Sequence, residues 1–130
     1  MYKRIIAAVD GSENGNRAAV RAGEVAKGSG AELLLINVEP REPVPDNLKQ
    51  FARAEHLDQG PQEVWENIGR EVLHRAKEAI EDRVGKDLKI ATRTAIGDPA
   101  HAILDAVDSE GADAVVVGTR GHGRLEGLVL

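Results

Sequence analysis

Apolar and polar residues along this chain follow two patterns in turn, one typical of strands and one of helices. Short apolar runs suited to buried strands cover residues 5–9, 33–38 and 114–117. Between them, apolar residues recur every three or four positions, as they do on one face of a helix. The chain therefore predicts the order β-α-β-α-β-α-β, which implies parallel strands joined by right-handed crossovers.

Two of the three predicted helices have recognisable starts. Ser12 is the expected N-cap of a helix over residues 13–27. A second helix is predicted over residues 63–84, and Asp98 with Pro99 marks the start of a third. The positions assigned to the buried faces are Ala18, Ala22, Val25 and Ala26 in the first, Trp65, Ile68, Val72, Ala76, Ala79 and Ile80 in the second, and Ala100, Ile103, Leu104 and Val107 in the third.

Two segments complete this layout. The alternation of Leu88, Ile90, Thr92 and Thr94 with smaller or more polar neighbours predicts a third strand that is more exposed than the others. Residues 39–62 are rich in proline and predict a long connection, which could hold one helical turn around 47–56. No repeat or linker divides the chain. We therefore expect a single α/β domain over residues 1–130, an open, Rossmann-like parallel sheet with helices on both faces.

Composition narrows the classes of function. The chain has 130 residues, of which 42% are hydrophobic and 30% charged, as in an ordinary globular domain. A net charge of −5 gives no broad attraction to nucleic acid or to an anionic membrane. No segment approaches the roughly 20 apolar residues of a membrane span, and the N-terminus lacks the apolar core of a signal peptide. Cysteine is absent, which excludes disulfides and thiolate metal sites. Taken together, these features make the cytoplasm the expected location.

Residues with potential chemistry follow the predicted strands. In an open parallel sheet, ligands bind beyond the carboxyl ends of the strands, where the strand order reverses. Three segments have this position, residues 8–12, 37–40 and 118–121. They converge on one crevice if the first and last strands are neighbours.

The loop after the last strand has two glycines, Gly118 and Gly121. Glycine lets backbone N–H groups approach an anion such as phosphate. Arg120, His122 and Arg124 add positive charge, which suits a polyphosphate. For the two glycines, the alternative is a glycine-rich loop that only turns the chain. For each charged residue taken separately, a solvated basic loop is the favoured interpretation.

Two further residues end strands. Asp10 could accept hydrogen bonds from ribose hydroxyls or hold a cation that bridges phosphates, or it could be a turn aspartate bonded to nearby backbone. The backbone of Val38 could pair with an adenine edge, although on the residues alone a plain core valine is favoured.

Motifs of common enzyme classes are missing. The sequence has no P-loop and no Gly-x-Gly-x-x-Gly after the first strand. Its histidines are scattered with no pair at metal-ligand spacing, and its serines lie in capping or turn contexts. The pattern indicates a binding site without evident catalytic machinery.

Four motifs in this order resemble the universal stress protein family. They are Ile-Ile-Ala-Ala-Val-Asp-Gly-Ser at residues 5–12, Leu-Leu-Ile-Asn-Val at 34–38, Gly-Asp-Pro at 97–99, and Ala-Asp-Ala-Val-Val-Val-Gly-Thr-Arg-Gly at 112–121. The resemblance covers essentially the whole chain. It implies a five-stranded parallel fold of the adenine nucleotide alpha hydrolase type, a homodimer, and a stress-response or regulatory role.

One branch of that family binds ATP through Gly-x2-Gly-x9-Gly-Ser/Thr. By resemblance, Gly118 and Gly121 match the first two glycines, Asp10 the aspartate on the ribose or cation side, and Val38 the residue whose backbone meets adenine. The implied ligand is ATP, with Mg²⁺ held through the phosphates rather than by a metal site of the protein. The residues implied to contact the nucleotide are Ala8, Val9, Asp10, Val38, Gly118, Arg120, Gly121 and His122.

The chain departs from that pattern at its end. The sequence reaches Leu130 nine residues after Gly121, so the third glycine and the hydroxyl residue of the motif are not in it. The family's last helix and fifth strand are not in it either. We expect the natural chain to continue past Leu130; the alternative is a chain that ends there and cannot close a phosphate site.

Three functions are compatible with these residues. The first is a regulatory domain that binds ATP and changes its contacts with an unidentified protein partner according to its occupancy. The second is an interaction module of the same fold without nucleotide. The third, a slow ATP hydrolase, is disfavoured because no base or nucleophile is in position.

Overall fold

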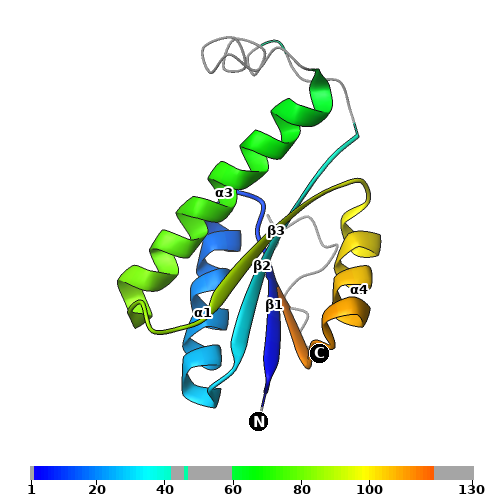
Figure 1. Ribbon diagram of the computed structural model, residues 1–130. Helices are drawn as coiled ribbons and strands as arrows, with labels where there is room; N and C mark the ends of the chain where they lie inside the picture. The colour runs from blue at the N-terminus through cyan, green and yellow to red at the C-terminus, as the bar shows by residue number, and fades with distance from the viewer. Residues whose placement is uncertain (1, 42–45, 47–59, 119–130) are drawn as a thin grey trace.

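The computed structural model describes residues 2–41, 46 and 60–118, in which strands and helices alternate (Figure 1). The elements are β1 (Arg4–Ala8), α1 (Glu13–Ser29), β2 (Glu32–Glu39), α3 (Pro61–Val84), β3 (Ile90–Ile96), α4 (Pro99–Glu110) and β4 (Ala114–Val117). The predicted order of elements is confirmed. The helical turn expected around residues 47–56 lies outside the described residues.

The described strands form one parallel sheet in the order β3-β2-β1-β4. From β1 the chain moves to β2 and β3 on one side and returns to β4 on the other. The strand order therefore reverses at β1, and the carboxyl ends of β1 and β4 flank the position where open sheets bind ligands.

Helices cover both faces of this sheet (Figure 1). On the face of α1 and α3, residues such as Ile5, Leu33 and Leu35 pack with Ala76 and Ile80. On the other face, a second cluster joins alternate strand residues to α4; its buried members are Ile6, Leu34, Ile36, Ile103, Ala106, Val115 and Val117. This alternation along each strand confirms the predicted α/β class.

Helix α1 packs through small residues. Ser12 is its N-cap, as predicted, and Gly30 ends it in the left-handed conformation with φ 69°. Its buried side chains are Ala19, Ala22 and Ala26, with Gly15 and Gly23 between them. The prediction that Val25 is buried is wrong, because the contact stripe passes beside it and leaves 42% of it exposed.

Helix α4 contacts the sheet along a narrow stripe. It starts at Asp98 and Pro99 as predicted, and Asp98 accepts a hydrogen bond from the His101 amide. Only Ile103 and Ala106 are buried in it. The expectation of a wider apolar face is wrong for Ala100, which is exposed, and for Leu104, which is 58% exposed.

Strand β3 is the outermost strand beside β2 and is only partly buried along its length, as its sequence pattern predicted. Its α3-facing side chains include Thr94 and Ile96, and Ile96 packs near Trp65. Among the described residues, no helix has the length and apolar character needed to cross a bilayer.

Candidate functional site

The ends of three strands meet at the carboxyl edge of the sheet. Ala8, the last residue of β1, is in register with Ile36 of β2 and with Val117 of β4. Val9 follows directly, and its amide donates to the Ile36 carbonyl at 2.9 Å. Ala8 and Val9 therefore lie between the two neighbouring strand ends, at the carboxyl edge of the sheet.

Asp10 begins the turn that leads from β1 into α1. Its side chain is exposed, and Oδ1 accepts from the Ser12 amide at 2.9 Å and from Ser12 Oγ at 2.5 Å. Ser12 Oγ in turn accepts from the Gly15 amide at 3.0 Å, which caps the helix. Asp10 thus has the local bonds of a turn aspartate, and these hold its carboxylate at the N-terminus of α1.

Gly118 brings the end of β4 to the same place. A Cβ added there would lie 2.5 Å from the Asn14 carbonyl oxygen and 2.8 Å from Ala18 Cβ. Gly15, which follows Asn14 in the first turn of α1, approaches Asp10 in the same way. A Cβ added to Gly15 would lie 2.8 Å from Asp10 Oδ1. The first turn of α1 therefore touches Gly118 and Asp10 through adjacent residues, so both lie on one rim of the molecule.

This contact also gives glycine at 118 a packing role that is independent of any ligand. No side chain fits between β4 and the α1 backbone at that point. The other predicted phosphate-side residues, Arg120, Gly121 and His122, lie outside the described residues.

Val38 lies at the end of β2 with its side chain half-buried against the α4 cluster. Glu32 donates its amide to Lys3 beside β1, and Ile36 accepts from Val9, so even-numbered residues of β2 direct their backbone groups toward β1. The pairing of β1 with β2 ends at Ala8 and Ile36. The backbone edge of Val38 therefore faces the region just past the end of β1.

Asn37 is a polar residue at this edge that the sequence reasoning missed. It is fully buried, and Nδ2 donates to the Val9 carbonyl at 2.9 Å. A signal was present, because Asn37 is the only polar residue in the predicted apolar strand over 33–38.

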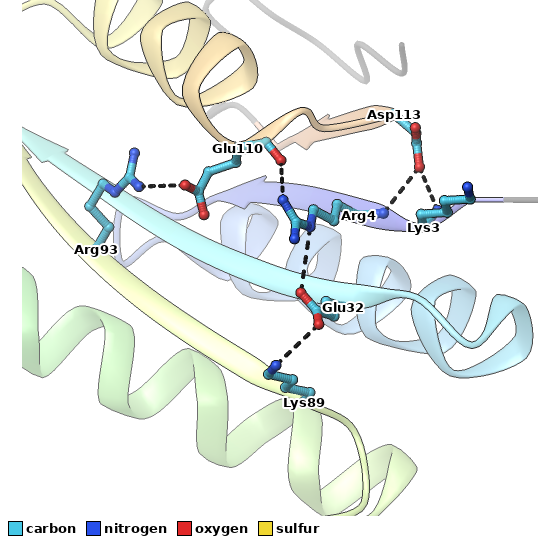
Figure 2. A network of polar contacts seen from close by, with 7 residues as sticks. All are labelled: Lys3, Arg4, Glu32, Lys89, Arg93, Glu110 and Asp113. Carbon is cyan, nitrogen blue, oxygen red and sulfur yellow. Dashed lines mark hydrogen bonds and ion pairs between the residues drawn. The ribbon is translucent and has the colours of Figure 1, made fainter.

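The opposite, amino edge of the sheet holds a network of charged residues (Figure 2). Asp113 accepts from the backbone amides of Lys3 and Arg4, and these two bonds lower the pKa of its carboxyl group from the ordinary value of 3.8. The further contacts are Arg4 Nη1 to the Glu110 carbonyl at 2.7 Å, Arg4 to Glu32 at 3.6 Å, Lys89 to Glu32 at 3.1 Å and Arg93 to Glu110 at 3.2 Å. The network joins the starts of all four strands.

Within residues 2–41, 46 and 60–118, no group of three or more histidine, aspartate or glutamate side chains could hold a metal ion. A hollow of about 480 Å³ lies along α1, with one lining residue from α3. It is lined by Glu13, Asn16, Arg17, Val20, Arg21, Glu24 and Ala79.

The fold and this edge define a parallel α/β domain of the kind that binds ligands at a strand-order reversal. The model of the universal stress protein family matches residues 1–130. The chain belongs to that family.

Named relatives agree with this assignment. The chain is 35% identical over 130 residues to a universal stress protein of Thermus aquaticus, covering all of this chain and 86% of the relative. It is 30% identical over 133 residues to the universal stress protein Rv1636 of Mycobacterium tuberculosis H37Rv, covering 99% and 84%. The crystal structure of Rv1636 superposes with a TM-score of 0.64 over 97% of this chain and 78% of that one, at 27% identity.

Two solved structures hold adenine nucleotides. One is a universal stress protein in complex with cAMP, with a TM-score of 0.65 and 23% identity over 95% of this chain and 78% of that one. The other is a universal stress protein family protein of Arabidopsis thaliana with AMP bound, with a TM-score of 0.58 and 16% identity over 93% and 79%. At these identities the likeness shows a shared fold.

Proposed function

We propose that this protein is a nucleotide-binding regulatory domain of the stress response that holds ATP at the carboxyl edge of its sheet. The observation that carries the proposal is the meeting of three strand ends: the Val38 backbone edge, the Asp10 carboxylate and Gly118 lie at the same edge of the sheet. Family membership and the two folds that hold cAMP and AMP support an adenine nucleotide as the class of ligand.

In this proposal each element has a separate task. The backbone of Val38 pairs with the adenine edge, and Ala8 and Val9 line the base pocket. Asp10 interacts with the ribose or with a Mg²⁺ ion bound to the phosphates, since a hard cation prefers oxygen ligands. The loop that starts at Gly118 holds the phosphates, with Arg120, Gly121 and His122 as its further members.

The residues of the described edge fit such a ligand. The Asp10 carboxylate is exposed and is directed by Ser12, so a group bound beyond the strand ends can reach it. The amino terminus of α1 lies beside it and favours negative charge nearby, as phosphates require.

The regulatory part of the proposal is a cytoplasmic homodimer whose contacts with a partner protein depend on bound nucleotide. It rests on the family alone. A ligand changes such contacts only as far as it binds the two states with different affinity.

The test combines extraction and thermal unfolding of the purified natural protein. We expect adenine nucleotide in a denaturing extract, or a rise in Tm with ATP and Mg²⁺ that GTP does not give. ATP at a hundredfold its Kd would add about 2.7 kcal/mol, or roughly 10 °C in Tm for a domain of this size.

The opposite results would assign the other functions. No extracted nucleotide and no shift at millimolar ATP would favour an interaction module without a ligand. Phosphate release that disappears in Asp10→Ala would favour a slow ATP hydrolase.

A further inference from the structure

Asn37 lies at a position of β2 where an apolar side chain would be expected. It is fully buried on the face of the sheet that α3 covers. A Cβ added to Gly69 of α3 would lie 2.6 Å from Asn37 Oδ1 and 3.2 Å from Thr94 Cγ2. The absence of a side chain at Gly69 therefore makes the space that the Asn37 amide occupies.

The Asn37 amide is only half satisfied by hydrogen bonds. Nδ2 donates to the Val9 carbonyl at 2.9 Å, whereas Oδ1 is buried with no hydrogen-bond partner among the described residues. A buried polar atom without a partner costs stability, and such groups are rare in folded proteins. Because this arrangement costs stability, we expect the hydrogen bond from Nδ2 to have a functional role.

That bond replaces a bond of the sheet. In a pair of parallel strands, a bonded residue spans its partner on the neighbouring strand. Its N–H donates to the carbonyl of the residue before the partner, and its carbonyl accepts from the amide of the residue after the partner. Val9 donates to Ile36, so its carbonyl would next accept from the Val38 amide. The ladder instead stops at Ala8 and Ile36, and the Val9 carbonyl accepts from the Asn37 side chain.

We infer that Asn37 is a positioning residue for the nucleotide. By occupying the Val9 carbonyl, its amide keeps the Val38 N–H from closing onto β1 and leaves it directed at the region where adenine would bind. The same bond fixes Val9, and through it the direction in which Asp10 leaves the strand. The inference rests on the proposed function, since it names a residue that prepares the same site.

The first test compares Asn37→Leu with the unchanged protein. Leucine keeps most of the volume and removes both polar atoms, so the Val9 carbonyl needs a new donor and the Val38 amide is the nearest in the ladder. We expect hydrogen exchange of the Val38 amide to slow by roughly tenfold without nucleotide. We expect the Kd for ATP, measured by calorimetry, to rise about tenfold. This is the lower end of the loss in metal affinity that follows when a residue orienting a metal ligand is removed.

A second pair of variants separates positioning from damage to packing. Gly69→Ala pushes against Asn37 Oδ1 at 2.6 Å, and Gly23→Ala pushes against Ile80 Cγ2 at the same 2.6 Å, between α1 and α3. Both insert one methyl group into a helix contact. We expect both to lower Tm, but only Gly69→Ala to change Val38 exchange and ATP affinity.

The outcomes distinguish a failure of the role of Asn37 from a failure of the proposed function. Unchanged Val38 exchange in Asn37→Leu and Gly69→Ala overturns the role of Asn37, even if ATP affinity falls. Equal loss of affinity in Gly23→Ala also overturns it, because general destabilisation would then explain the effect. If the unchanged protein binds no nucleotide, the proposed function fails, while slower Val38 exchange in Asn37→Leu still supports the control of this backbone edge by Asn37.

Discussion

Charged side chains at the amino edge of the sheet bond segments that are far apart in the sequence, whereas Asp10 at the carboxyl edge makes hydrogen bonds within its own turn. At the amino edge, Asp113 bonds the amides of Lys3 and Arg4 from the other end of the chain, and Lys89 pairs with Glu32 of the neighbouring strand (Figure 2). At the carboxyl edge, Asp10 bonds Ser12, two residues away.

The difference indicates separate tasks for the two edges. Charges at the amino edge are matched by groups of the protein itself and align the starts of the strands. At the carboxyl edge, glycines allow backbone segments to approach closely and a buried amide ends the ladder early. The amino edge therefore serves the fold, and the carboxyl edge is where we propose that the ligand binds.

The largest expected effect is on packing at Gly118. Gly118→Ala would place a methyl group 2.5 Å from the Asn14 carbonyl oxygen, which belongs to the backbone and cannot turn away. We expect a loss of about 3 kcal/mol in the free energy of unfolding, measured by urea denaturation. Gly28→Ala in α1 is the control: its Cβ meets nothing within 4 Å, so a gain of about 0.5–1 kcal/mol is expected.

Equal stability of Gly118→Ala and the unchanged protein would contradict the close contact between β4 and α1. It would also remove the packing explanation for glycine at that position.

The next effect is on nucleotide binding at Asp10. Asp10→Asn keeps an oxygen that can accept from Ser12 but removes the negative charge offered to a ribose or a cation. We expect ATP with Mg²⁺ to bind about tenfold more weakly, or about 1.4 kcal/mol, with little change in Tm. Unchanged ATP affinity in calorimetry would reduce Asp10 to a turn residue.

At the amino edge, Asp113→Asn tests stability against pH. Backbone amides of Lys3 and Arg4 hold the pKa of Asp113 below its ordinary value, so its contribution is complete above the unfolded-state pKa. That contribution is lost as the pH falls through the lower folded-state pKa. Urea unfolding at pH 7, 5 and 3 should show the unchanged protein ahead of the variant at the first two, with a smaller gap at pH 3.

A gap that stays constant down to pH 3 would contradict this assignment. ATP affinity at pH 7 should be the same in both proteins, because Asp113 lies at the opposite edge from the proposed site.

The smallest effect is expected for the exposed ion pairs of the amino edge. Glu32→Gln removes pairs with Arg4 at 3.6 Å and Lys89 at 3.1 Å, all partly exposed. We expect a loss of about 0.5 kcal/mol or less, which disappears in 1 M NaCl because salt screens such pairs. A larger, salt-independent loss would mean that Glu32 has another structural role.

Periodicity was enough to predict the order of elements, because three strands are short apolar runs, β3 alternates between apolar and polar residues, and two of the helices start at a recognisable cap. It failed at Val25 and Leu104, since a pattern of apolar residues does not show how wide a contact stripe the neighbouring layer needs. Helix α1 contacts its neighbours through alanine and glycine residues, so the buried stripe of the helix does not include the larger Val25.

The candidate site could be predicted in position but not in detail. Asp10 and Gly118 follow strands and Val38 lies near the end of one, and the rule for open sheets brings them to one edge. Asn37 could not be found in this way, because its role depends on which carbonyl its side chain reaches across the sheet. The packing role of Gly118 likewise depends on the approach of α1, which sequence spacing does not reveal.

Titration of the isotopically labelled protein with ATP and Mg²⁺, followed by ¹H–¹⁵N NMR, tests the central claim most directly. The account predicts that amide signals of Asp10, Gly11, Ser12, Val38 and Gly118 shift in a saturable way, while those of Arg4, Glu32, Lys89 and Asp113 stay in place. Saturable shifts confined to the amino edge, or no saturable shift at any of these amides, would contradict it.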